Sequence, residues 1–209
     1  MNGDSSKKAL LEKAIKAIPC GVVFSSRDLK IDIGEDSLRQ NLKRLVDGGR
    51  IRRVRRGFFE RPAYSNFLRE ELGTDMLKTA EGIARSNNWT IAPTGNAALN
   101  LLGLSTQVPA NWTFVSDGPY KKYDIGGRRL EFRHRANRTI TGMSPKTNLV
   151  VQALKSLPAE QTTDAVIEKI RRNLSGREKR MLLRETTLVS RRILGIVRRI
   201  CEDKDAQGS

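Results

Sequence analysis

A cluster of arginines in the first third of the chain has the chemistry to bind phosphates. Guanidinium groups donate charge-assisted, often bidentate hydrogen bonds to phosphate oxygens. Only one acidic residue, Glu60, follows closely, so little charge is neutralised nearby. We therefore expect the cluster to contact a polyanion rather than to form only a solvated face. Its members are Arg50, Arg52, Arg53, Arg55 and Arg56.

The segment just before this cluster has the spacing of an amphipathic helix. Its apolar residues over positions 36–47 recur every three or four residues and should face a core. Arginine can read guanine and glutamine can read adenine in the major groove. We expect this helix to contact DNA bases, and the arginine cluster to contact phosphates or a narrow minor groove. The opposite, polar face carries Ser37, Arg39, Gln40, Lys43 and Arg44.

The elements around these residues follow the order of a winged helix-turn-helix. Helical periodicity covers residues 5–18, and a short apolar run at 22–24 is typical of an edge strand. Ser25 or Ser26 can cap a short helix over 27–31 and place a backbone amide against phosphate, so both are predicted DNA contacts. After the 36–47 helix, the arginine cluster falls on a β-hairpin that turns at Gly57, and this hairpin is the wing.

The remainder of the chain predicts a mixed α+β fold. A stretch at residues 62–73 is typical of a linker, which places a winged-helix domain at residues 1–66 and a second domain at residues 67–209. We expect the second domain to combine a small sheet with a helical C-terminal half. Its predicted elements are a helix after Thr74, strands at 89–92, 112–115 and 129–134, and helices at 96–102, from Ser144 through 154, near 160–173 and at 176–202.

The composition agrees with a nucleic-acid-binding protein. The 209 residues include 39 lysines and arginines against 23 acids, for a formal net charge of +16. Phosphate backbones are therefore favoured as partners over anionic lipid, for which the aromatic anchors of an interfacial helix are missing. Since no apolar run reaches the length of a membrane span, and no signal-peptide pattern is present, we expect a cytoplasmic protein without a membrane partner. Cys20 and Cys201 are predicted to be reduced, packed thiols.

Four stretches of the sequence resemble AbiEi-type antitoxins of type IV toxin–antitoxin systems, and the resemblance covers most of the chain. Leu-Gly-Leu-Ser-Thr-Gln-Val-Pro is the most specific part of it. The four stretches are Gly21-Val-Val-Phe-Ser25, Leu42-Lys-Arg-Leu-Val-Asp-Gly-Gly-Arg-Ile51, Arg56-Gly-Phe-Phe59 and Ala97-Ala-Leu-Asn-Leu-Leu-Gly-Leu-Ser-Thr-Gln-Val-Pro-Ala110.

This resemblance implies a function for each domain. The first domain would bind double-stranded promoter DNA and repress its own operon, with contact through Arg39, Gln40, Lys43, Arg44 and the arginines of the wing. The second domain would antagonise a toxin similar to nucleotidyltransferases. The resemblance implies no enzymatic activity, and neither a cofactor nor a metal is expected. It does not explain why the C-terminal half is so basic.

Two other functions remain open. The chain could be a winged-helix transcriptional regulator without a toxin partner. Less favoured is a metal-dependent nuclease, in which Asp124 and Glu131 would hold a divalent ion beside Arg133. We expect these residues to form a polar hairpin edge instead, with ion pairs across the strands. His134 is expected on the surface of a strand, and one histidine with two distant cysteines does not predict a zinc site.

The C-terminal helices combine apolar faces with basic ones. An ordinary solvated surface, a second phosphate-contacting face and docking on an acidic toxin are all open readings of this pattern. The loop Gly103–Pro109 is expected to be a structural turn after a helix. The basic residues are Lys169, Arg171, Arg172, Arg177, Lys179, Arg180, Arg184, Arg191, Arg192, Arg198 and Arg199.

Overall fold

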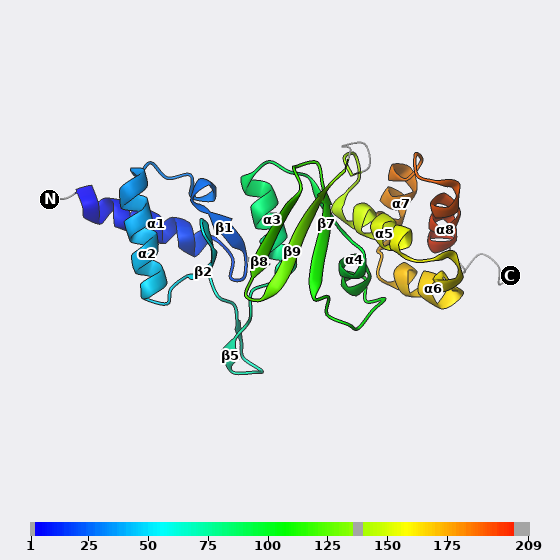
Figure 1. Cartoon of the computed structure of the whole chain (residues 1–209), viewed down its shortest axis with the longest axis horizontal. Coiled ribbons are helices and arrows are strands. Elements are labelled where there is room, and N and C mark those ends of the chain that lie inside the picture. The colour runs from blue at the N-terminus through cyan, green and yellow to red at the C-terminus, as the bar shows by residue number, and fades with distance from the viewer. Residues whose placement is uncertain (1–2, 136–139, 203–209) are drawn as a thin grey trace. The chain divides into compact units, whose positions relative to one another are not determined.

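The computed structural model describes residues 3–135 and 140–202 (Figure 1). The chain divides into two compact units, residues 1–89 with 124–127 and residues 90–123 with 128–209. The described part holds eight α-helices and three small sheets, which confirms the predicted α+β class. Within it, none of the helices is both long and apolar enough to cross a bilayer.

The first unit has an α/β arrangement consistent with a winged helix. Strand β3 lies between β1 and β2 in an antiparallel sheet. The apolar positions predicted for the two long helices meet in a core, whose buried members are Leu11, Ile15, Phe24, Leu29, Ile33, Leu42, Ile51 and Phe59. In chain order the elements are α1 (Gly3–Ala17), β1 (Val23–Ser25), the 3-10 helix η1 (Ser26–Leu29), α2 (Glu35–Asp47), β2 (Arg52–Arg55) and β3 (Phe58–Glu60).

The short helix expected at 27–31 is only a single 3-10 turn. It ends at Lys30, which adopts a left-handed φ of 46°. Ser25 precedes the turn, and its backbone N and Oγ donate to Asp28 Oδ2 at 2.7 and 3.0 Å. Burial raises the pKa of Asp28, but hydrogen bonds from Arg85 and Ser25 outweigh this and hold the pKa below its ordinary value.

Residues 62–73, expected to be a linker, contain a small hairpin. Strands β4 (Tyr64–Ser65) and β5 (Glu70–Glu71) pair antiparallel, and α3 (Met76–Ser86) follows. Arg85 of α3 donates to Asp28 Oδ1 and to the Val23 carbonyl, both at 2.7 Å. Because α3 packs on β1 in this way, the first compact unit extends to Trp89, beyond the segment 1–66 that the sequence suggested.

A glycine allows α3 to approach β1 closely. A Cβ added to Gly82 would lie 2.7 Å from the Val23 carbonyl oxygen and 3.0 Å from Val23 Cβ. Since the obstacle includes backbone, Gly82→Ala must push the helix outward, and we expect it to lower the free energy of unfolding by about 1–3 kcal/mol. Urea unfolding measures this, with the helix-favouring Ser86→Ala as control. An unchanged midpoint for Gly82→Ala would contradict the tight packing.

A four-stranded sheet in the order β6-β7-β9-β8 opens the second unit, except that the last two residues of β8 group with the first unit. β6 and β7 are antiparallel, β7 and β9 are parallel, and the Phe114 and Phe132 rings on these last two strands lie 5.9 Å apart between centroids. β8 was not predicted because it is an edge strand of mostly polar residues. The elements are β6 (Ile91–Thr94), α4 (Asn96–Leu101), β7 (Asn111–Ser116), β8 (Lys121–Ile125) and β9 (Arg128–His134).

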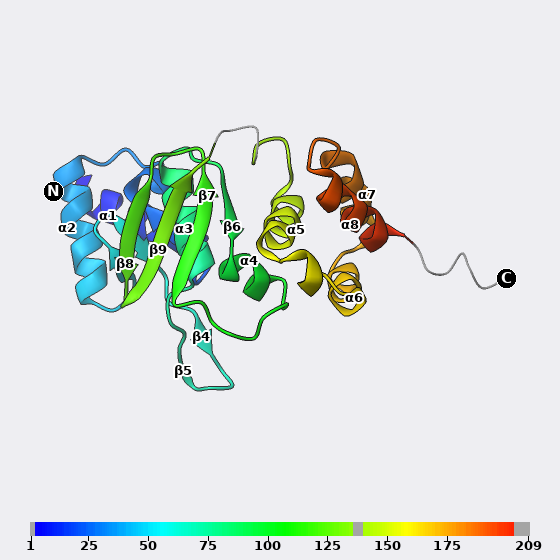
Figure 2. The ribbon, with the colours of Figure 1, turned by 45° about the vertical axis from the view of Figure 1, so that its right-hand side comes forward.

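Short helices complete the second unit (Figure 2). The expected cap at Ser144 with Pro145 in the first turn and the capping box of Ser175 with Glu178 are both confirmed. The region 176–202 is two helices, because buried Thr186 donates to the Leu182 carbonyl and β-branched residues follow before Ser190 starts the next helix. The elements are α5 (Pro145–Ser156), η3 (Ala159–Gln161), α6 (Asp164–Arg172), α7 (Gly176–Glu185) and α8 (Arg191–Cys201).

Candidate nucleic-acid interface

Helix α2 presents a polar face to solvent, as its spacing predicted. Leu42 is buried in the core, whereas Gln40 and Lys43 on the opposite side are exposed. At 100° per residue, Gln40 lies at the centre of the outer face, Arg44 and Lys43 lie about 40° and about 60° to either side of it, and Arg39 lies at the edge beyond Lys43. The outer face therefore offers an amide flanked by an ammonium group and a guanidinium, and the edge beyond Lys43 adds a second guanidinium.

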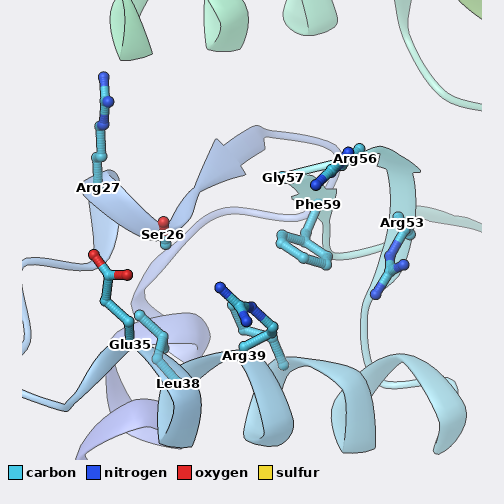
Figure 3. Close-up of a pocket in the computed structure, with 10 residues that line it drawn as sticks. Ser26, Arg27, Glu35, Leu38, Arg39, Arg53, Arg56, Gly57 and Phe59 are labelled. Carbon is cyan, nitrogen blue, oxygen red and sulfur yellow. The ribbon is translucent and has the colours of Figure 1, made fainter.

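Arg39 lies on the edge of α2 that faces the wing. A groove of about 690 Å³ runs between them (Figure 3). In Figure 3, Arg39 extends from α2 toward the wing, and Arg53 comes down from β2 on the opposite side. The groove thus gathers guanidinium groups from two separate elements. Its lining is Ser26, Arg27, Glu35, Leu38, Arg39, Leu42, Arg53, Arg56, Gly57 and Phe59.

The wing holds its outer arginines against aromatic rings. The guanidinium carbon of Arg53 lies 5.7 Å from the centroid of Phe59, and that of Arg55 lies 5.5 Å from Phe58. Such cation–π contacts limit where the side chains can point. Arg56 stands beside Gly57, whose φ of 80° makes the turn. Arg53 and Arg56 are exposed, so both can reach a phosphate in the groove.

Two residues of the arginine cluster have structural partners instead. Arg52 donates to Glu60 Oε1 at 2.6 Å and to the Leu72 carbonyl at 2.8 Å. Arg50 donates to Glu12 of α1 at 3.2 Å, on the side of α2 away from the groove. Of the five predicted wing contacts, Arg53 and Arg56 are exposed and line the groove.

The pair of Arg52 and Glu60 stabilises the wing. Glu60 is only 1% exposed, and it also accepts a hydrogen bond from the Thr74 hydroxyl at 2.6 Å. Removing the cation would leave a buried carboxylate with too few partners. Since Arg52 is partly exposed, we expect Arg52→Ala to lower the free energy of unfolding by about 2–3 kcal/mol. Thermal unfolding of Arg52→Ala together with Glu60→Gln is the check: the second change should restore part of the loss. No recovery would contradict the assignment.

The predicted serines are placed differently from one another. Ser25 is buried and its hydroxyl is used by Asp28, so its side chain does not reach a ligand. Ser26 is exposed and lines the groove. Ser37 is half-buried, and its carbonyl accepts from Asn41 Nδ2 at 2.9 Å. Arg44 is exposed but belongs to a smaller hollow beside α1, together with Arg50.

Arg27 and Glu35 also line this groove, and the sequence analysis did not predict either as a DNA contact. Arg27 donates to the Ser86 carbonyl at 3.0 Å, so it is held by α3. Glu35 is the one acid of the lining, at the first turn of α2, where the helix dipole favours a negative charge. In the sequence, the only sign that Arg27 lies at the groove is its position directly after the capping serines.

The carboxylates considered for nuclease chemistry have local partners. Asp124 Oδ1 accepts from the Gly127 amide at 3.0 Å within its turn. Glu131 accepts from Tyr120 at 2.6 Å and from Arg133 Nε at 3.1 Å. The hydrogen bonds of Arg133 and Tyr120 lower the pKa of Glu131. In the part of the chain that the structure describes, no three His, Cys, Asp or Glu residues form a group able to hold a metal.

The structure also shows where His134, the two cysteines and the loop 103–109 lie. His134 Nδ1 lies 3.0 Å from the Gly118 carbonyl on an exposed strand end. Neither cysteine forms a disulfide: Cys201 is half-buried, as expected, but Cys20 is exposed rather than packed. Asn100 Nδ2 donates to the carbonyl of Gln107 in the loop 103–109 at 2.9 Å, and this hydrogen bond fixes the turn.

Several basic residues of the C-terminal helices fix those helices together. Arg192 donates to the Leu154 carbonyl at the end of α5 at 2.8 Å. Arg171 donates to the Ile200 carbonyl at the end of α8 at 3.1 Å, and Arg199 pairs with Asp164. Such contacts satisfy carbonyls at helix C-termini. The exposed arginines of α7, in contrast, have no ion pair among the described residues.

Comparison with known proteins gives a family and similar solved structures. The family model described as a family of unknown function, DUF6088, matches residues 10–182. No curated protein matches the chain. A crystal structure of the RV2827C protein from Mycobacterium tuberculosis is similar, with 14% sequence identity and a TM-score of 0.44. The match covers 96% of this chain and 77% of that one.

Proposed function

The chain belongs to the DUF6088 family, and we propose that its first unit binds duplex DNA. The observation that carries the proposal is the groove between α2 and the wing, where Arg39, Arg53 and Arg56 gather with Glu35 as the one acid. In winged-helix proteins a helix of this kind enters the major groove. Gln40 and Lys43 on its outer face would then meet base edges, and the three arginines would contact phosphates.

The charge of the whole chain supports the same proposal. A net charge of +16 attracts a polyanion over distances comparable to the Debye length, before any specific contact forms. The arginines at the groove then determine where the backbone is held. If these arginines formed only a solvated surface, nothing would require guanidinium groups from two separate elements to line the same groove.

A comparison of double-stranded and single-stranded DNA tests this proposal. The full chain would be titrated against one labelled sequence in both forms, followed by fluorescence anisotropy. Because α2 needs a major groove, we expect duplex to bind at least about tenfold more tightly. Equal affinities would contradict the winged-helix mode. Magnesium-dependent cleavage of the duplex that Asp124→Asn abolishes would point to the nuclease alternative.

We further propose that the protein is an antitoxin that represses its own operon. Support comes from the resemblance of Gly21–Ser25, Leu42–Ile51, Arg56–Phe59 and Ala97–Ala110 to AbiEi-type antitoxins. Its partners would be promoter DNA and a toxin similar to nucleotidyltransferases. Expression of such a toxin from the neighbouring gene, with and without this chain, tests the role. Growth arrest that this chain does not relieve would leave a plain transcriptional regulator.

A further inference from the structure

The β4–β5 hairpin is an arm with an apolar tip. It extends away from the helices and strands of the first unit (Figures 1 and 2). At its tip Phe67 is 94% exposed and Leu68 is 54% exposed. An aromatic side chain left almost wholly in water loses the burial that normally stabilises it, so this tip is suited to be covered by a partner.

The arm is built to hold this tip in place. The Leu72 amide donates to the Ala63 carbonyl at 2.7 Å, and the Leu68 amide donates to Ser65 Oγ at 3.1 Å. Arg69 adopts a left-handed φ of 55° to make the turn. Arg52 of the wing anchors the base through the Leu72 carbonyl. The apolar tip is therefore presented on an ordered hairpin.

The charge of the arm favours a basic protein surface as its partner. Its second strand consists of Glu70 and Glu71, both exposed, and Glu71 Oε2 lies 4.0 Å from Arg52 Nη1. Arg69 at the turn offsets one of the two acidic charges, and the net negative charge of the hairpin disfavours insertion of Phe67 into a duplex. A chain with a net charge of +16 carries the complementary surface itself. A second copy of the same chain is thus a suitable partner.

Helix α7 offers a surface of matching chemistry. Arg177, Arg180 and Arg184 are exposed, and with half-buried Met181 they line a hollow of about 430 Å³. Among the described residues these arginines form no ion pair. A methionine thioether adapts well to an aromatic ring, and arginines can receive carboxylates in bidentate fashion.

We propose that the arm of one copy docks on α7 of a second copy, with Phe67 and Leu68 against Met181 and with Glu70 and Glu71 against the arginines. In a two-fold dimer the contact forms twice, which doubles the buried surface. The dimer would present two winged helices to DNA, as repressors of paired half-sites do. This last consequence rests on the proposed DNA binding, but the docking itself does not.

Sedimentation velocity of the full chain without DNA tests the docking. We expect a concentration-dependent dimer, and an increase of at least about tenfold in its dissociation constant for Phe67→Ser. Val108→Ser, at another exposed apolar residue, is the matched control and should leave the dimer unchanged. A wild type that stays monomeric at all concentrations, or a dimer that Phe67→Ser does not weaken, would overturn the proposal.

A charge exchange identifies the docking surface. Glu70→Arg with Glu71→Arg should lose the dimer, and so should Arg177→Glu with Arg180→Glu. An equal mixture of the two variants should restore it, because each arm then meets a groove of opposite charge. Failure of the mixture to associate would overturn the assignment to α7. A monomeric chain in which Phe67→Ser weakens DNA binding would assign the tip to DNA instead.

The two proposals fail in different ways. The Phe67→Ser variant is expected to be monomeric. Its affinity for a duplex with a single binding site then depends only on the groove between α2 and the wing. Retained affinity with no dimer in the wild type would reject the arm alone. A dimer without duplex binding would reject the DNA-binding proposal alone.

Discussion

Replacement of both Arg53 and Arg56 by alanine is expected to weaken binding to every duplex by about a hundredfold. Each side chain would lose one charge-assisted phosphate contact, worth roughly tenfold in affinity. The plot of log affinity against log salt should also become shallower by about 2, since two fewer counterions are released. Fluorescence anisotropy at several salt concentrations measures both quantities. The fold should be intact, because neither residue has an ion pair among the described residues.

The matched control removes the same charge from other places. Arg129 and Arg191 are exposed arginines of the second unit, and their joint replacement by alanine also lowers the net charge by two. If long-range attraction alone held DNA, this control would weaken binding as much as the wing variant. We expect a much smaller effect, and equal effects would contradict the assignment of phosphate contacts to the wing.

Replacement of Gln40 and Lys43 by alanine is expected to abolish most of the discrimination between specific and scrambled duplex. Both are exposed on the outer face of α2, where a helix in the major groove meets base edges. A good base contact is worth about 1–3 kcal/mol of discrimination, whereas binding to scrambled DNA depends mainly on phosphates. Competition titrations with both duplexes give the ratio of affinities directly.

Arg44→Ala serves as the control for this second prediction. Arg44 is on the same helix but turned toward α1 and Arg50. Its loss should lower the affinity for both duplexes slightly and leave their ratio nearly unchanged. If the ratio survives the loss of Gln40 and Lys43 but falls with Arg44→Ala, then base recognition lies on the other edge of α2.

The sequence predicted α2 and the wing well because their patterns are local. The spacing of Leu38, Leu42 and Leu45 determines which face of α2 is buried, and Gly57 marks the turn of the wing. Which arginine faces the ligand depends instead on the strand register. Arg52 stands opposite Glu60 in β2 and β3, and only the folded hairpin shows that this pair is used for stability.

Other features depended on tertiary packing that no short pattern records. The β4–β5 strands are too short to alternate, and Pro62 and Gly73 at the edges of the segment read as a linker. The packing of α3 on the first unit depends on Gly82 meeting Val23, far away in sequence. The C-terminal arginines looked alike in sequence, but Arg171 and Arg192 are used at helix ends and Arg177 and Arg180 are not.

A gel-shift titration with the DNA upstream of the protein's own gene shows whether the chain binds a specific duplex. The unmodified chain would be titrated against that DNA and against a scrambled duplex of equal length, at two salt concentrations. We predict tighter binding to the upstream DNA at both, with a ratio that persists when higher salt weakens both complexes. Absence of binding to either duplex at low salt would contradict DNA binding by the first unit. Equal binding to both would remove the base-reading role of α2.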